Sequence, residues 1–405
     1  MKKSLSVILS ALALLPTLYS CKQQDPLSVR MIRSEISRCP DATFLDGRAG
    51  TPKWNYTTGL ELLAFQDAAR TYSLKDVDAY VRNWADLMNE GEGKIKTYKK
   101  SNYNVDHICP ARIYFRLYDD ALAKGDSLGA SSYKAVLDSI RSQVESQPRT
   151  EAGAFWHKKI YPYQLWLDGL YMALPFYAQY TARFESDPAE ADRCYRDIVH
   201  EFEVAADKTF DPATGLFRHA WDESRKMFWA DPVTGQSAHA WGRADGWYAM
   251  ALVEVLDIIP ESHPGHKVLA DQLEYLLGAV QKFADPATGM WYQVLDCPAR
   301  EGNYLESTCS IMFVYAALKG VSKGWLDSAE WGTRSRQAYD SFVKTFIREN
   351  SDGTISMTSC CAVGGLGGKQ MRSGDFDYYL SEPIVENDPK GVGPFIWASL
   401  IYEGQ

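Results

Sequence analysis

The sequence predicts an all-α, single-domain (α/α)6 toroid, in which an outer ring of six helices surrounds an inner ring of six. Two observations lead to this prediction. Nearly uncharged helical segments alternate along the chain with amphipathic, charged ones, and a turn motif between the two kinds of helix occurs twice. Helices that are apolar on every side are buried, whereas amphipathic helices keep one face in water. The alternation therefore indicates an inner and an outer ring.

The repeated motif is Asp-Pro-Ala-Thr-Gly, at 211–215 and again, 74 residues later, at 285–289. These residues are typical of a helix end followed by a turn. Each copy follows an amphipathic helix and precedes a nearly uncharged one, as expected if each repeat is one helical hairpin.

Twelve helices are expected, six for each ring, with few strands between them. The inner helices are predicted at 59–69, 109–119, 169–181, 246–259, 308–320 and 393–402. The outer helices are predicted at about 27–38, 75–90, 132–146, 189–208, 265–283 and 333–348. Short hairpin strands are expected at 289–295 and 353–357.

Composition and charge narrow the class of protein. The chain has 405 residues, of which 46% are hydrophobic and 23% charged, so it can bury a large core and is not disordered. Its formal net charge is −9, and no basic run interleaved with aromatics is present, which makes nucleic acid an unexpected partner. The negative net charge does not exclude an anionic small substrate, because a few well-placed side chains determine what a site binds.

The N-terminus predicts export and lipid anchoring. Residues 1–20 combine Lys2 and Lys3 with an apolar run, and resemble a lipoprotein signal peptide that ends at a lipobox, Leu-Tyr-Ser-Cys. Cys21 is then the acylated first residue, 21–45 a tether and lead-in, and 46–405 the toroid. The expected location is the periplasm or cell surface of a bacterium, attached to a membrane only through this anchor. A single-pass N-terminal anchor and a plain secretory signal are the alternatives.

Seven further cysteines show no CxxC or histidine-rich spacing, so no metal site is predicted. Most of them are interpreted as small core residues. The glycine-rich segment 359–368 lacks the spacing of a dinucleotide or phosphate loop and is interpreted as a rim loop that approaches a ligand.

Aromatic and ionisable residues gather before the predicted inner helices, which in a toroid begin at one rim. A concave mouth ringed by loops is a common ligand site. Aromatic rings beside hydrogen-bonding groups suit a sugar, which has both an apolar face and hydroxyls. The aromatic candidates are Tyr56, Trp166, Trp241 and Trp247. Core packing is the alternative for each of them.

Asp168 is the sharpest candidate for an acid, and Asp106 is a second carboxyl group before the preceding inner helix. Helix capping is the alternative for both. The helix dipole lowers the pKa of a carboxyl group at this position. An acid role for Asp168 therefore requires that desolvation or a second carboxylate raise its pKa by more than the dipole lowers it.

His219 and Arg243 precede the fourth predicted inner helix. His219 is either a structural residue or a hydrogen-bond donor to the ligand. Arg243 either pairs with Asp245 or offers a bidentate fork to a carboxylate.

Five blocks of sequence together resemble the unsaturated rhamnogalacturonyl hydrolases of glycoside hydrolase family 105, which are related to the unsaturated glucuronyl hydrolases of family 88. The blocks lie at 164–173, 219–222, 241–247, 359–368 and 378–394. The resemblance extends from about residue 50 to the C-terminus.

The resemblance implies an enzyme without a cofactor that removes a Δ4,5-unsaturated uronic acid from lyase-generated oligosaccharides of the pectin or rhamnogalacturonan type. It implies that Asp168 protonates C4 of the enol ether, which fits an acid of raised pKa, and that Asp106 is the second acid. His219, Arg243 and Trp247 are implied to contact substrate. A glycan-binding lipoprotein, an ordinary inverting glycosidase and a sugar epimerase on a similar toroid are the alternatives.

Overall fold

A computed structural model of the chain describes residues 25–47, 51–298 and 300–404. The predicted signal segment and Cys21 lie outside these residues. Within the described part of the chain, no helix combines the length and the apolar character that crossing a membrane requires.

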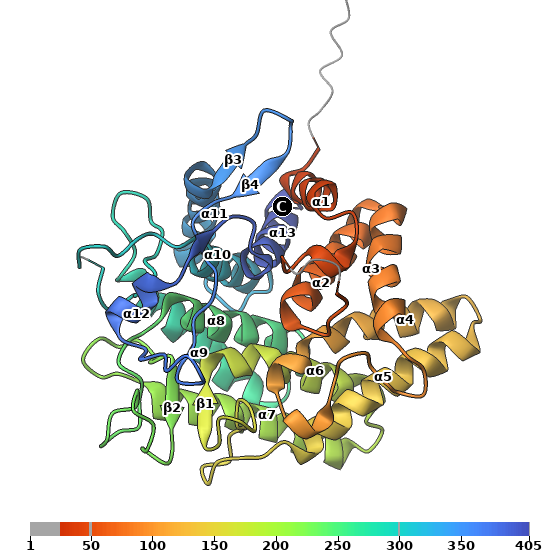
Figure 1. Cartoon of the computed structure of the whole chain (residues 1–405), viewed down its shortest axis with the longest axis horizontal. Coiled ribbons are helices and arrows are strands. Elements are labelled where there is room, and N and C mark those ends of the chain that lie inside the picture. The colour runs from red at the N-terminus through yellow and green to blue at the C-terminus, as the bar shows by residue number, and fades with distance from the viewer. Residues whose placement is uncertain (1–24, 48–50, 299, 405) are drawn as a thin grey trace, which may run out of the picture.

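The inner ring consists of six helices that follow one another around the barrel. Each contacts the next directly or through the short 3-10 turn before α4, and α13 returns to α2, which closes the ring. In Figure 1 the chain colours run around the ring from red to blue until α13 lies beside the red N-terminal helix. The inner helices are α2 (Tyr56–Tyr72), α4 (Arg112–Ala123), α6 (Leu167–Phe184), α8 (Gly242–Leu256), α10 (Ser307–Ser322) and α13 (Pro389–Glu403).

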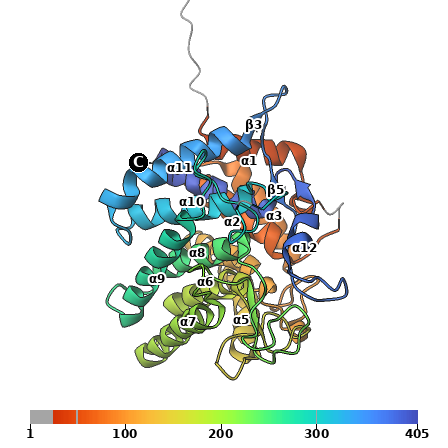
Figure 2. The ribbon, with the colours of Figure 1, turned by 90° about the vertical axis from the view of Figure 1, so that its left-hand side faces the viewer.

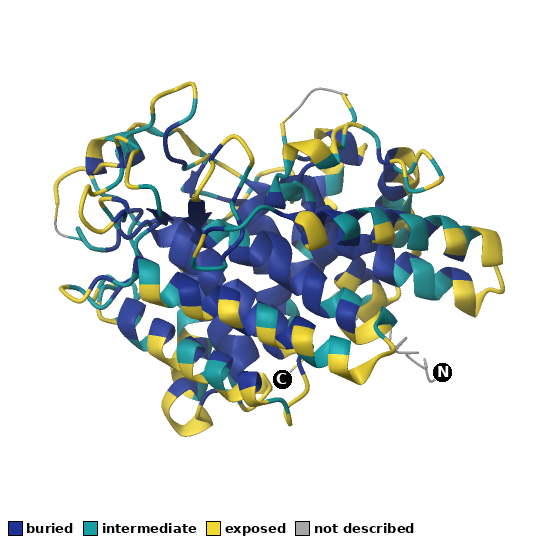
Figure 3. Cartoon of the chain, turned by 90° about the horizontal axis from the view of Figure 1, so that it is seen from below, coloured by how far each residue is buried: buried dark blue, intermediate teal, exposed yellow. Residues whose placement is uncertain are grey.

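The outer helices each pack against one inner helix, and Figure 2 shows several of these hairpins from the side. They are α1 (Leu27–Arg38), α3 (Lys75–Met88), α5 (Ser127–Ser146), α7 (Pro188–Thr209), α9 (Pro264–Gln281) and α11 (Ser328–Phe346). Figure 3 shows the consequence for burial, with dark blue helices in the middle and exposed yellow faces on the outer ones.

The sixth hairpin joins the two ends of the described chain. Helix α1 packs on α13, and the Ser28 hydroxyl donates a 2.5 Å hydrogen bond to the Glu403 carboxylate. The segment predicted as tether and lead-in, 21–45, therefore contributes the outer helix that covers the last inner helix.

The (α/α)6 prediction is confirmed, with corrections at the helix starts. Helix α8 begins at Gly242 rather than 246, so Arg243 and Asp245 lie in its first turn instead of before it. Segment 289–295 is not a strand, because only isolated bridges, such as Trp241 to Val294, tie it to its neighbours. The hairpin expected at 353–357 forms between β3 (Ile347–Glu349) and β4 (Ile355–Met357).

The rim at which the inner helices begin carries the irregular structure. Strands β1 (Gln164–Trp166) and β2 (Ala220–Asp222) pair antiparallel there, as do β5 (Cys360–Cys361) and β6 (Ile384–Val385). The sequence predicted neither pair, because strands of two or three residues carry too little alternation to be recognised. The short helices are η1 (Ala42–Phe44), η2 (Lys100–Asn102), η3 (Val105–His107), η4 (Cys109–Ala111) and α12 (Phe376–Ser381).

A buried ion-pair network ties three inner helices together inside the ring. Glu254 of α8 accepts hydrogen bonds from Arg112 of α4 and, at 2.7 Å, from Lys319 of α10. Burial raises the pKa of the Glu254 carboxyl group, but Lys319 and Arg112 outweigh it, so the net pKa is lowered and the group stays ionised. Neither cation of the network is more than 11% exposed.

Replacing Glu254 by Gln is expected to lower the free energy of unfolding by about 3–5 kcal/mol, because the change leaves buried Arg112 without its counter-charge and Lys319 with Asp257 alone. Chemical denaturation at neutral pH measures this loss. Because the pKa of Glu254 is lowered on folding, its contribution is present above the unfolded pKa and disappears as the pH falls through the folded one. Glu261→Gln, at an exposed position, is the matched control. Equal stability of the two variants would contradict the role given to the network.

Candidate active site

A cavity of about 360 Å³ opens at the rim where the inner helices begin. Four of the residues predicted from the sequence line it, namely Tyr56, Asp106, Trp166 and Asp168. They come from three different inner-helix starts, so the fold brings together side chains that are up to 112 positions apart. His219, Arg243, Trp241 and Trp247 are not among its lining residues.

Strand β1 and the start of α6 hold Asp168 at this mouth. The backbone N–H of Leu167 donates to the carbonyl of His219 at 3.1 Å, beside the β1–β2 pairing. Trp166, not Asp168, occupies the N-cap position of α6, and no side chain caps this helix. The capping explanation for Asp168 is therefore wrong, and its carboxyl group is directed to the cavity instead.

Asp168 faces an imidazole. Oδ2 of Asp168 lies 3.1 Å from Nε2 of His219, whose Nδ1 lies 2.7 Å from the hydroxyl of Tyr379 in α12. Nδ1 and the Tyr379 hydroxyl share one hydrogen bond. With the hydroxyl as its donor, Nε2 carries the ring proton and presents it to Asp168. His219 is itself fully buried, so it acts on the cavity through Asp168.

The pKa of Asp168 is lowered. Burial raises it, but His219 above all, with His157 and Arg243, outweighs burial. The expectation of a raised pKa is therefore wrong for the protein without substrate, because the desolvated carboxylate lies next to an imidazole rather than next to a second carboxylate. At neutral pH Asp168 is ionised.

Asp106 is held by two basic residues. Its carboxylate lies 2.7 Å from Nζ of Lys158 and 3.4 Å from Nε2 of His157. Burial raises the pKa of Asp106, but Lys158 and His157 lower it by more than burial raises it, so the net pKa is lowered. In η3 the side chain of Asn104 accepts from the backbone of Asp106, so Asp106 does not cap this turn.

His157 links the two carboxylates. Its backbone carbonyl accepts from Val105 at 3.1 Å and its N–H donates to Gln164 at 2.8 Å, which joins the loop of Asp106 to strand β1. Burial lowers the pKa of His157 to about 4, so the imidazole is neutral at neutral pH.

An aromatic stack forms one wall of the cavity. The ring of Trp166 lies parallel to those of His157 and Tyr161, with centroid distances of 4.7 and 5.2 Å. Only 5% of Trp166 is exposed. The stack is thus a rigid wall, of which Trp166 is the middle layer.

The other predicted aromatic residues pack behind this mouth. Trp247 stacks on Tyr171 and meets the edge of Tyr56, while Trp241 stacks on Tyr379, and each of the two tryptophans is 1% exposed. Both rings lie in the core behind the cavity wall, with no open face for a sugar.

Arg243 lies in the same layer, with its guanidinium 4.7 Å from the ring of Trp241. It donates to the carbonyl of Cys361 and does not pair with Asp245, whose carboxylate oxygens have no hydrogen-bond partner among the side chains described.

The glycine-rich segment reaches the cavity through Ala362, Val363 and Gly364. A Cβ on Gly364 would lie 2.4 Å from the Trp241 ring, so this backbone approach requires glycine.

Further lining residues were not predicted from the sequence: His157, Lys158 and Arg372, of which the last follows the glycine-rich segment. Arg372 lies 3.4 Å from the hydroxyl of Tyr161. The sequence did carry a signal for His157 and Lys158, because both belong to a basic and aromatic run just before β1, at the same rim as Asp168. Among the residues described, the one grouping of potential metal ligands is His239, Asp296 and Cys297, and none of them lines the cavity.

Two carboxylates, cations and an aromatic wall at the mouth of a helical toroid define a carbohydrate-active enzyme. The sequence model of Glycosyl Hydrolase Family 88 matches residues 27–404. The chain belongs to this family and is a glycoside hydrolase, which confirms the family resemblance of its motifs.

Individual relatives agree with this assignment. The structure of a family 105 glycoside hydrolase from C. acetobutylicum ATCC 824 superposes with a TM-score of 0.87 at 38% identity, over 94% of this chain and 100% of that one. Protein Atu3128 of Agrobacterium fabrum is 37% identical over 235 residues, 56% of this chain and 96% of that protein. Unsaturated rhamnogalacturonyl hydrolase YesR of Bacillus subtilis is 27% identical over 226 residues, 53% of this chain and 57% of that protein.

Proposed function

We propose that this glycoside hydrolase removes a Δ4,5-unsaturated uronic acid from the non-reducing end of lyase-generated oligosaccharides of the rhamnogalacturonan or pectin type. One relative, YesR of Bacillus subtilis, is named as an unsaturated rhamnogalacturonyl hydrolase. The observation that carries the proposal is that the Asp168 carboxyl group, which caps no helix, faces a cavity of about 360 Å³ with cations on its wall.

The reaction begins with hydration of the double bond. Asp168 in its protonated form gives its proton to C4 of the enol ether, and water adds at C5, where Asp168 accepts the proton that the water releases. The C5 hemiketal opens to a ketone, the ring oxygen becomes the hydroxyl of a hemiacetal at C1, and this hemiacetal releases the aglycone as an alcohol. One acid suffices, so no pair of carboxylates flanking the glycosidic bond is needed.

Asp168 is ionised in the free protein and must gain a proton when substrate binds. The substrate supplies the cause, because it carries a carboxylate, and a like charge beside Asp168 favours the protonated form. His219 then turns from a partner of the ionised carboxylate into the group that holds the carboxyl oxygen in place.

Cations on the cavity wall attract the substrate carboxylate. Lys158 and Arg372 line the cavity, as does Lys390 at the start of α13. Lys158 and Lys390 already pair with Asp106 and Asp388, whereas Arg372 makes 3.4 Å contacts to a tyrosine hydroxyl and to the Gly367 carbonyl. Arg372 is therefore well placed to form a bidentate pair with a carboxylate. A local site of this kind is compatible with a net charge of −9.

We propose further that the enzyme is exported and anchored through an acylated Cys21, in the periplasm or at the cell surface. The apolar segment before Cys21 and the lipobox support this. Retention of a Cys21→Ala variant in the membrane fraction would contradict the anchor.

Incubation with lyase-generated rhamnogalacturonan oligosaccharides is expected to abolish the ultraviolet absorbance of the conjugated double bond, because hydration removes the conjugation. Saturated oligosaccharides of the same polysaccharide are the control and are expected to stay intact. Constant absorbance with rhamnogalacturonan-, homogalacturonan- and glycosaminoglycan-derived substrates would refute the proposed function. Binding without turnover would favour a glycan-binding lipoprotein instead.

Asp168→Asn is expected to lower kcat by about 10²–10⁴-fold while the fold and substrate binding persist, because the amide keeps the shape but cannot donate an acidic proton. Steady-state kinetics and circular dichroism measure the two effects. The matched control is Asp78→Asn, the same change in the first turn of outer helix α3. Turnover near that of the unmodified enzyme would leave Asp168 without a catalytic role.

A further inference from the structure

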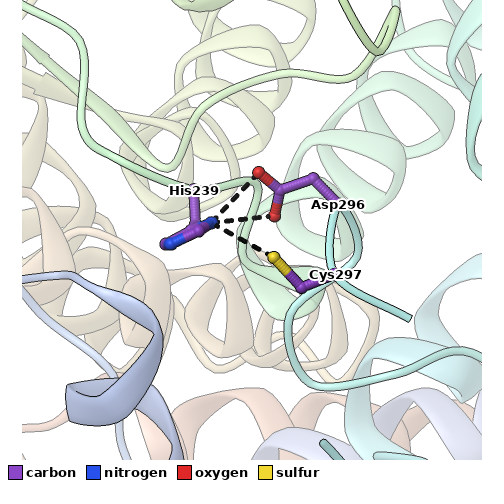
Figure 4. Close-up of side chains that lie close together, drawn as sticks. All are labelled: His239, Asp296 and Cys297. Atoms are coloured by element: carbon purple, nitrogen blue, oxygen red, sulfur yellow. Dashed lines mark hydrogen bonds and ion pairs between the residues drawn. The ribbon is translucent and has the colours of Figure 1, made fainter. Parts of the chain in front are cut away.

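Three metal-ligating side chains meet outside the catalytic cavity. His239 lies in the loop before α8, and Asp296 and Cys297 lie in the loop before α10. Figure 4 shows the three side chains converging, with Nδ1 of His239 facing both the carboxylate and the thiol. Their spacing along the chain fits no common zinc motif, so the sequence did not predict this group.

The distances from His239 to the other two ligands are close to those around a tetrahedral ion, and all three ligand atoms lie within 4.8 Å of one another. Nδ1 of His239 lies 3.1 and 3.2 Å from the oxygens of Asp296 and 3.7 Å from Sγ of Cys297. Bonds of about 2.0–2.3 Å to zinc place tetrahedral ligands roughly 3.3–3.6 Å apart. We propose that His239, Asp296 and Cys297 form a binding site for a zinc ion. The nitrogen, oxygen and sulfur set favours a borderline-soft divalent metal over magnesium or calcium.

Arg218 orients the carboxylate of this site. Its guanidinium donates to Oδ2 of Asp296 at 2.8 Å and to Asp211 at 2.8 Å. Oδ1 of Asp296 lies 3.2 Å from Nδ1 of His239, so this oxygen can bind the ion while Oδ2 keeps its hydrogen bond with the arginine. In metal sites, the ligand atoms that do not bind the ion are typically hydrogen-bonded to neighbouring groups.

The charges of the group also balance around a divalent ion. Cys297 binds as the thiolate and releases its proton to solvent. The ion and Arg218 then carry three positive charges, which the thiolate, Asp296 and Asp211 neutralise. Water has access to complete the tetrahedron, because 18% of the His239 side chain is exposed and Cys297 is partly exposed.

The ion would clamp two loops that support the catalytic residues. The carbonyl of His239 accepts from the backbone of His219, the partner of Asp168, at 3.2 Å. Leu295 donates to the carbonyl of Ala240 at 3.0 Å, so the two loops are already adjacent. A zinc ion at this site would hold His219 in place from behind, and the site does not depend on the proposed substrate.

Cobalt(II) titration of the full chain under a phosphine reductant tests the site. One equivalent is expected to bind, with a thiolate-to-cobalt absorption band that zinc abolishes by displacement, and zinc is expected to raise the melting temperature. Cys297→Ser is expected to remove the band and to weaken zinc binding by about 100-fold or more. Cys39→Ser, at the other partly exposed thiol within residues 25–404, is the matched control and should change neither.

Absence of the thiolate band in the unmodified protein would overturn the site, whatever the variants do. So would a band that persists in Cys297→Ser, since another thiol would then be the ligand. Because neither readout involves turnover, failure of the zinc site and failure of the proposed hydrolase activity are distinguishable.

Discussion

The contact between the Asp168 carboxylate and the His219 imidazole is the interaction on which the site depends. It lies at the β1–β2 pairing, which brings the loops before α6 and α8 together. Tyr379 of α12 shares a hydrogen bond with the other ring nitrogen, so three distant segments of the chain surround one carboxyl group. The closed toroid supplies this convergence, because every inner helix begins at the same rim.

The contact also sets a condition on catalysis. An imidazole that stabilises the ionised carboxylate keeps Asp168 in the wrong form for donating a proton. Asp106 does not replace it, because Lys158 and His157 keep that carboxyl group ionised as well. In the proposed mechanism, the carboxylate of the substrate therefore raises the pKa of Asp168 and so produces the acid. A neutral sugar lacks that charge, so the same contact favours uronides over ordinary glycosides.

The sequence predicted the ring architecture well, because inner and outer helices differ in charge along their whole length. It predicted the two acids and two of the cavity aromatics, because these lie at the starts of inner helices. It did not predict that Trp247 and Arg243 lie behind the wall, since exposure depends on packing between α6, α8 and the C-terminal loop. The sequence also could not predict that the pKa of Asp168 is lowered, because this shift depends on a histidine 51 residues away. The group formed by His239, Asp296 and Cys297 was not predicted either, because it likewise joins residues that are far apart in the sequence.

Proton uptake on ligand binding tests the central claim most directly. Calorimetry of a saturated, unreactive uronide at neutral pH, in buffers with different ionisation enthalpies, counts the protons that enter the complex. The account predicts that the unmodified enzyme takes up as much as one proton and that Asp168→Asn, which still binds, takes up none. Equal proton uptake by the two proteins would contradict the claim that substrate binding protonates Asp168.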